Sequence, residues 1–239
     1  MHLRDVFVAI AVVAMASAAQ AGVIQDHING LDPTDAFFDF RNAAIYESCD
    51  GFDSCFREEI NANDRGVTIS TDTPDRKLYR DSADGFGIRG NENDEIDSDE
   101  VLTILFEGGW QATTLGLTDL FLASDGGPDG EEAIVRGFRD NALVYELRLL
   151  GQFALGNGNG ERIFDLPGVA VDFLEFHSVE NPNLTFTNPD LAQTNTGQSN
   201  DEYSVAFIGG TAIGVAEPGS LALLGFGLAG LGLLRRQRV

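Results

Sequence analysis

A stretch near the C-terminus, Leu221 to Leu234, contains no charged or polar side chain. As a helix it would rise about 21 Å, most of the way across the roughly 30 Å hydrocarbon core of a bilayer. Three arginines follow directly and favour the cytoplasmic side for that end: Arg235, Arg236 and Arg238. The stretch therefore predicts a membrane-spanning segment, and it confines any globular fold to the residues before it.

Within this stretch, residues 225–230 read GFGLAG and match the dinucleotide-binding pattern G-x-G-x-x-G. That pattern binds a cofactor only at the start of a βαβ unit, and no crossover helix or second strand follows here. Glycine is frequent in membrane helices. We interpret GFGLAG as part of the membrane segment and not as a nucleotide loop.

The opposite end has the layout of a secretory signal peptide. Arg4 precedes an apolar run from Val6 to Ala16, and small residues then end in Ala19-Gln20-Ala21, an A-x-A cleavage pattern. This layout predicts a signal peptide over residues 1–21, export through the secretory translocon and a mature start at Gly22. An uncleaved anchor is the alternative, although the apolar run is shorter than the roughly 20 residues of a membrane span.

The charge of the chain is strongly acidic, with 38 acidic against 15 basic side chains and a net charge of −23. A surface of this sign repels phosphate backbones, so nucleic acid is excluded as an expected partner. Export also predicts a disulfide between the two cysteines, Cys49 and Cys55, because compartments outside the cytoplasm are oxidising.

The C-terminal segment has three parts in order: Ala216-Glu217-Pro218, the apolar span rich in glycine and leucine, and the arginine cluster. This order resembles the PEP-CTERM sorting signal of exported proteins in Gram-negative bacteria, with Ala216 in place of the first proline of Pro-Glu-Pro. The resemblance implies that residues 215–239 insert transiently into the inner membrane, where an exosortase-type protease recognises and removes them. It also implies a final place at the cell surface or in the extracellular matrix. A plain membrane anchor that is never cut is the alternative.

Residues 22–214 have the marks of an all-β fold, which we predict to be a single β-sandwich or jelly-roll-like domain. Short apolar runs recur between Gly, Asn, Asp and Pro. The predicted strands are Val67–Thr71, Val101–Phe106, Leu115–Leu122, Ala142–Leu150, Arg162–Leu166, Ala170–Phe176, Leu184–Phe186 and Ser204–Ile208. Residues 156–160, GNGNG, predict a tight hairpin between two of these strands. One helix is expected, from Thr34 to Glu47, with Thr34 as its N-cap. Residues 85–106 also resemble a segment of exported PEP-CTERM proteins, which implies location and fold but no activity.

One turn in that segment gathers many oxygen ligands, which suit Ca²⁺ because this ion accepts six to eight of them in loose geometry. The predicted ligands are Asp94, Glu95, Asp97, Asp99 and Glu100. The spacing is not that of an EF-hand. A solvated acidic loop is the alternative interpretation, and residues 125–132 form a second, weaker candidate.

Catalysis has little support in the sequence. His27 and His177 are the histidines of the body, and neither belongs to an H-E-x-x-H motif; a G-x-S-x-G elbow is also missing. We therefore expect no enzyme. Trp110, flanked by Gly108 and Gly109, is the aromatic side chain expected to be exposed and to stack on a sugar ring.

Three functions follow from these features. The first is a non-enzymatic component of an exopolysaccharide or biofilm matrix, and the second is a calcium-dependent, lectin-like carbohydrate-binding module. The third, a glycan hydrolase with paired carboxylates, ranks last because many acidic residues are present and no pair stands out.

Overall fold

Strand β6 (Val101–Thr118) is the centre of the fold and is 18 residues long. Gly108 and Gly109 interrupt its regular ladder with φ angles of 75° and 84°, a left-handed conformation that favours glycine. Residues before the two glycines pair with β3 (Arg65–Thr71) and with most of β10 (Ala170–Ser178). Residues after them pair with β13 (Ser204–Ala212), with β9 (Arg162–Asp165) and with the first two residues of β10. A single strand thus joins two parts of the sheet.

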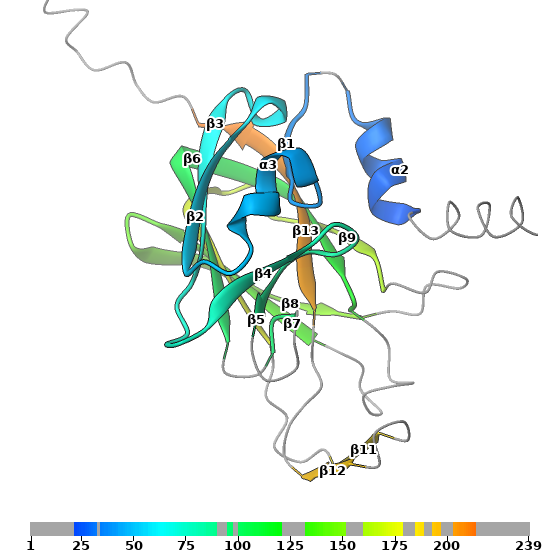
Figure 1. The fold of residues 1–239 in the computed structure, drawn as a ribbon. Coiled ribbons are helices and arrows are strands. Elements are labelled where there is room, and N and C mark those ends of the chain that lie inside the picture. Colours follow the sequence, from blue (N-terminus) through cyan, green and yellow to red (C-terminus); the bar gives the residue numbers. More distant parts are fainter. Residues whose placement is uncertain are drawn as a thin grey trace, which may run out of the picture.

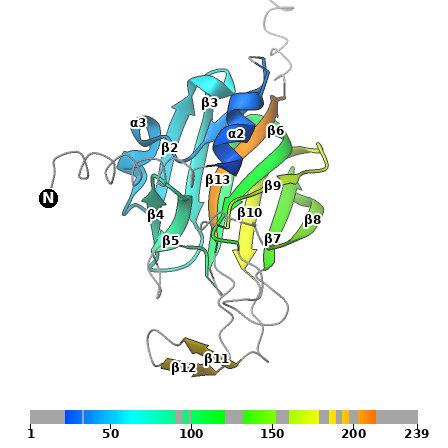
Figure 2. The same ribbon diagram turned by 90° about the vertical axis from the view of Figure 1, so that its right-hand side faces the viewer.

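The computed structural model describes residues 22–32, 34–89, 95–97, 100–120, 132–151, 160–178, 185–188, 193–196 and 203–213. They form an 11-stranded antiparallel sheet with the path β4-β5-β13-β6-β10-β7-β8, to which β1, β2, β3 and β9 add (Figure 1). The remaining strands of this sheet are β1 (Ala36–Asp39), β2 (Ser54–Glu59), β4 (Lys77–Asp81), β5 (Gly85–Arg89), β7 (Glu132–Arg139) and β8 (Ala142–Leu150). A separate hairpin of β11 (Thr185–Asn188) and β12 (Gln193–Thr196) lies apart from this sheet in both views (Figure 2).

Among the described residues, helical structure is confined to short elements. They are α2 (Val23–Gly30), α3 (Ala43–Tyr46) and the 3-10 turns η1 (Glu47–Cys49) and η2 (Ile60–Ala62). The all-β class predicted from the sequence is therefore confirmed, with eleven of the described strands in one large antiparallel sheet.

The helix predicted from Thr34 to Glu47 is wrong. Ala36 to Asp39 form strand β1, which pairs with β13, and only Ala43 to Tyr46 are α-helical. The physical reason is a two-residue period, since Ala36 and Phe38 face the core while Phe37 packs on the opposite side against Phe207. The N-cap of α3 is Asn42, whose side chain accepts a hydrogen bond from the Ala44 N–H at 3.1 Å.

The hairpin predicted across residues 156–160 is also wrong. Strands β8 and β9, which flank that segment, do not pair with each other: β8 pairs with β7 and β9 pairs with β6. The turn that does form a hairpin is Asp140-Asn141, between β7 and β8, with φ angles of 51° and 60°. Asp and Asn tolerate this left-handed conformation, which suits the twist of a two-residue hairpin.

A single apolar core fills the space between the two parts of the sheet. Phe38 from β1 lies 4.9 Å from Trp110 and 5.6 Å from Phe106 of β6, measured between ring centroids. Phe40, Tyr46 and Phe86 form a second group of rings at the α3 side, with centroids 5.3 to 5.7 Å apart. The core is therefore rich in aromatic contacts around β1 and β6.

A second apolar cluster lies on the opposite face of β13. Phe207 and Ala206 pack there against Ile24 of helix α2, with Ile28 and Ile163 at the margin. In Figure 2, α2 lies in front of β13 at this place. Helix α2 thus covers this part of the outer face of the sheet.

Candidate functional site

The predicted sorting residues Ala216, Glu217, Pro218, Arg235, Arg236 and Arg238 lie outside the described residues, as does the predicted signal peptide. The last described residue, Ile213, follows β13 directly, and its backbone N–H donates to the Gly109 carbonyl at 3.3 Å. Within the part of the chain that the structure describes, no helix is long and apolar enough to span a membrane. The C-terminal segment thus continues directly from a strand in the middle of the sheet.

The two cysteines lie together, as the sequence predicts. Cys49 in η1 and Cys55 in β2 form a disulfide with Cα atoms 5.4 Å apart, within the usual range for such bridges. The pair ties the short helical segment after β1 to the edge of the sheet.

The predicted calcium turn is only partly within the described residues, since Asp94 and Asp99 lie outside them. Glu100 points inward: it is 3% exposed, and its Oε2 accepts a hydrogen bond from the Asp97 N–H at 3.0 Å. Its Oε1 has no hydrogen-bond partner and lies 3.5 Å from Arg76 Nε, a long ion pair. Burial raises the pKa of Glu100 to about 7. The Glu100 carboxylate therefore binds the backbone of its own turn and points inward.

Glu95 has a different neighbourhood, because it lines a small pocket with three carboxylates from other turns. These are Asp81 and Asp84 of the β4–β5 turn and Asp119 just after β6, with Tyr79 and Ser204 completing the wall. Sequence analysis missed these three, since nothing in their spacing relates them before the strands pair. Among the described residues, no group of three or more His, Cys, Asp or Glu is arranged to hold a metal ion.

The expectation that Trp110 is exposed is wrong, because its side chain is fully buried. The ring packs against Phe38 and Phe106, so it presents no face to a sugar. A Cβ added at Gly210 of β13 would lie 2.6 Å from Trp110 Nε1. Gly210 therefore lets the backbone of β13 pack directly against the indole. The glycines that flank Trp110 in sequence do not make it exposed.

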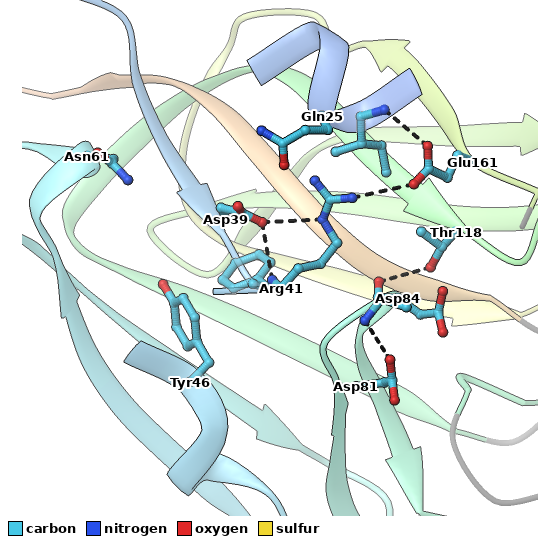
Figure 3. A network of polar contacts seen from close by, with 12 residues as sticks. Gln25, Asp39, Arg41, Tyr46, Asn61, Asp81, Asp84, Thr118 and Glu161 are labelled. Atoms are coloured by element: carbon cyan, nitrogen blue, oxygen red, sulfur yellow. Dashed lines mark hydrogen bonds and ion pairs between the residues drawn. The ribbon is translucent and has the colours of Figure 1, made fainter. Parts of the chain in front are cut away.

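A polar network ties the N-terminal helix to the sheet (Figure 3). Glu161, only 2% exposed, accepts hydrogen bonds from the N–H groups of Val23 and Ile24 at 2.8 and 3.2 Å. Its other oxygen lies 3.4 Å from Arg41 Nη1, and Arg41 Nε lies 3.4 Å from Asp39 Oδ1. A negative charge at the start of a helix offsets the helix dipole and satisfies unpaired N–H groups. Glu161 thus holds α2 in place.

A second buried carboxylate, Glu59, lies nearby and is also fully partnered. It accepts hydrogen bonds from the Tyr46 hydroxyl at 2.7 Å, the Asp39 N–H at 3.2 Å and the Asn61 amide at 3.3 Å. Burial raises the pKa of Glu59 to about 7, while these three donors act in the opposite direction. This cluster has no open side for a ligand, so we interpret it as structural.

The outer face of the other part of the sheet carries a different arrangement, which we call the apolar row. In the register of the strands, one line crosses β2, β3, β6, β10, β7 and β8 through directly opposed residues. In that order they are Phe56, Thr68, Leu105, Phe173, Phe138 and Leu143. At about 4.8 Å between strands, the row is about 24 Å long.

Several members of the apolar row are open to solvent. Phe56, Leu105 and Leu143 are each about half exposed, and the rings of Phe138 and Phe173 stack on each other with centroids 4.6 Å apart. Residues directly opposite in neighbouring strands contact one another on the same face. The apolar row is therefore a line of partly exposed side chains on the outer face of the sheet.

The next line on the same face is polar and charged. Glu175 of β10 is opposite Arg136 of β7, which in turn is opposite Glu146 of β8. Arg136 Nε lies 2.8 Å from Glu146 Oε2, and the pKa of Glu146 is lowered, first by its hydrogen bond from Arg136. The apolar row thus has an ionic border, as docking surfaces commonly do.

Comparison with known families adds one finding. Residues 206–237 match the family model of the PEP-CTERM protein-sorting motif, so the chain is a protein with a PEP-CTERM sorting segment. This confirms the resemblance drawn from the sequence, and it implies export, membrane-associated sorting and processing by an exosortase. No curated protein matches the chain. The match begins inside β13, so the motif region includes residues of the folded sheet.

Proposed function

We propose that this chain is a non-enzymatic surface or matrix protein whose folded body, residues 22–214, is delivered outside the cell by its sorting segment. The observation that carries the proposal is the sorting-motif match, which starts at residue 206 within β13. Since β13 pairs with β1, β5 and β6, the sorting segment is continuous with the core of the body.

The short connection between body and membrane segment supports the proposal. Ile213 is hydrogen-bonded to Gly109, and the predicted span begins at Leu221. Seven intervening residues reach at most about 25 Å when fully extended. The body therefore folds and stays at the membrane surface until the segment is cut, which suits a protein handed over to the cell surface.

Variants of the sorting motif test the proposal. Glu217→Ala with Pro218→Ala should leave the full chain in the membrane fraction, while the wild type appears at the surface or in the medium as a shorter chain. Asp165→Ala, an exposed carboxylate in β9, is the matched control and should be sorted normally. Detection of the wild-type chain only in the cytoplasm, at full length, would contradict the proposal.

We propose calcium-dependent carbohydrate binding as the second candidate. The pocket that includes Glu95 is the place to test it, because carboxylates from several turns line it, although the described ones are not arranged as a ready-made metal site. With Trp110 buried, the sugar would contact the apolar row. Calorimetry with Ca²⁺ should give binding that Asp81→Asn with Asp119→Asn abolishes and Asp165→Asn preserves. A titration without heat, or glycan binding unaffected by a chelator, would rule this candidate out.

A further inference from the structure

Strand β8 ends the sheet, and its outer edge is open among the described residues, where it pairs with β7 alone. It is nine residues long, with the sequence ALVYELRLL. Proteins usually protect such an edge with proline, lysine or a very short strand. Strand β8 has no proline or lysine and is not short; its two charged residues are one acidic and one basic, and its register shifts once, where Val144 lies between the pairs Gly137–Tyr145 and Phe138–Leu143. Within the described ranges, no further strand pairs with this edge.

The exposed side chains of β8 form a pattern that is complementary to itself when two copies of the strand run antiparallel. Val144 is 40% exposed and Leu150 is 53% exposed, and both charged residues between them, Glu146 and Arg148, are exposed as well. Glu146, Arg148 and Leu150 alternate on one face of the sheet, and Val144, at the register shift of β8, is exposed beside them. Along the strand they run apolar, acidic, basic, apolar.

We propose that β8 is the contact between two copies of this chain, paired antiparallel about Leu147. In this register Glu146 of each copy is opposite Arg148 of the other, and Val144 is opposite Leu150. Each of these pairs occurs twice because a two-fold contact is self-complementary. Directly opposed residues of opposite charge, or of large apolar type, stabilise a sheet.

The neighbouring registers are less favourable for a definite reason. Centring the pair on Glu146 places two glutamates directly opposite each other, and centring it on Arg148 does the same with two arginines. Like charges in directly opposed positions are destabilising. Of these three registers, the side-chain pattern favours the one centred on Leu147.

The contacts already made within one chain fit the same register. Glu146 is paired with Arg136, and Arg148 Nη1 lies 3.5 Å from Glu132 Oε1. In the dimer, Glu146 would lie between its own Arg136 and the partner's Arg148, so charges alternate across the junction. The net charge of −23 opposes association at long range, but salt screens separations beyond about 8 Å at physiological ionic strength.

The experiment measures the mass of the full chain in mild detergent by light scattering at physiological salt, over a range of concentrations. The wild type should be a dimer that dissociates on dilution. Glu146→Arg and Arg148→Glu should each weaken it at least about tenfold, because each places like charges in opposition. Glu58→Arg, on exposed β2 of the same sheet, is the matched control for the charge change and should dimerise as the wild type does.

Mixing the two variants gives the sharpest result. A Glu146→Arg chain carries two basic residues at the contact and an Arg148→Glu chain carries two acidic ones, so the mixed pair is fully complementary. An affinity tag on one variant should capture the other, while neither variant captures itself. This outcome also shows that both variants are folded.

Three outcomes would overturn the proposal: a wild type that stays monomeric at every concentration, a dimer indifferent to both charge reversals, or single variants that mixing does not restore. Leu150→Lys provides a second route, because it changes an exposed residue and leaves the ion pairs intact. A dimer unaffected by Leu150→Lys would place the contact elsewhere.

Discussion

Both outer faces of the sheet carry apolar side chains, but they differ in whether a described element covers them. On the β13 side, Phe207 and Ile163 are covered by helix α2, whose first turn is held by Glu161. On the β8 side, the apolar row and the edge strand have no cover among the described residues. Helix α2 covers the first face, and the contact that we propose between two copies lies at the edge of the second.

This difference separates residues that stabilise the fold from residues that act between molecules. Side chains under α2 should contribute strongly to the free energy of unfolding, because removing them leaves a cavity. Side chains of the apolar row and of β8 should contribute little to it and much to association. The following predictions test that division.

The largest effect is expected for Phe207→Ala, which empties the space between β13 and α2. We expect the free energy of unfolding to fall by about 3–5 kcal/mol, the usual range for a buried Phe→Ala change. Leu105→Ala on the apolar row is the matched control and should cost less than about 1 kcal/mol, since its side chain is about half exposed. Urea denaturation measures the unfolding free energy of both variants. Equal decreases in the two variants would contradict the proposed difference between the faces.

Glu161→Ala should follow, with a loss of about 3 kcal/mol, because it removes one of the two carboxylates that pair with the buried Arg41 guanidinium and leaves Asp39. It also removes the acceptor for two N–H groups of α2. Glu146→Ala, which breaks an exposed ion pair on the open side, should cost much less. Hydrogen exchange at α2 should rise in Glu161→Ala alone; unchanged exchange would show that the cap does not hold the helix.

The buried carboxylates predict a defined pH dependence. Folding raises the pKa of Glu59 from 4.5 to about 7, so the folded state binds the proton more tightly than the unfolded state does. Stability from this group is therefore full below pH 4.5 and lost as the pH rises through about 7. The loss is on the order of 2–3 kcal/mol.

Glu100 has the same direction of shift, so both residues contribute to the same window. Glu59→Gln should flatten the decline in unfolding free energy between pH 5 and pH 8, and Glu100→Gln should do so independently. Glu58→Gln, an exposed neighbour, is the control and should leave the pH profile unchanged. A profile that both buried variants leave intact would contradict this assignment.

Loss of the disulfide should have a smaller effect. Replacing both Cys49 and Cys55 by Ser should lower the free energy of unfolding by about 2 kcal/mol, because the bridge closes a short loop. Strand β2, which holds Cys55, is separated from β8 by β3, β6, β10 and β7. Dimerisation through β8 should therefore persist. Loss of the dimer in this variant would show that the two regions are not independent.

The smallest effect on the fold is expected for Leu150→Lys at the open edge. Its unfolding free energy, extrapolated to a monomer, should stay within about 0.5 kcal/mol of the wild type, as for other exposed positions. The same change should weaken dimerisation. A large loss of monomer stability would mean that Leu150 belongs to the fold and not to a contact between copies.

The pattern of apolar residues in the sequence predicted the strands whose bounds depend on neighbouring residues. Strand β8 was predicted with its observed bounds, and β10 and β13 were predicted over most of their length. The two runs of β6 were predicted as separate strands, because Gly108 and Gly109 interrupt the alternation of apolar residues. Pairing could not be predicted in the same way, since β6 contacts β13, β10, β3 and β9, which are distant in sequence.

The candidate sites show the same limit. The sorting segment was found from sequence because its information is contained in consecutive residues. The acidic pocket and the apolar row were missed, because each is assembled from several strands whose register is set by long-range pairing. Trp110 was placed on the surface because its covering strand, with Gly210, follows about a hundred residues later.

The central claim is that this is an exported protein sorted by its C-terminal segment, and an intact mass measures it most directly. The chain would be produced in a bacterium that has an exosortase, and the protein recovered from the cell surface or medium would be weighed by mass spectrometry. The account predicts a chain that starts at Gly22 and lacks the apolar stretch from Leu221 to Leu234. A full-length chain of 25.7 kDa that remains in the cytoplasm would contradict it.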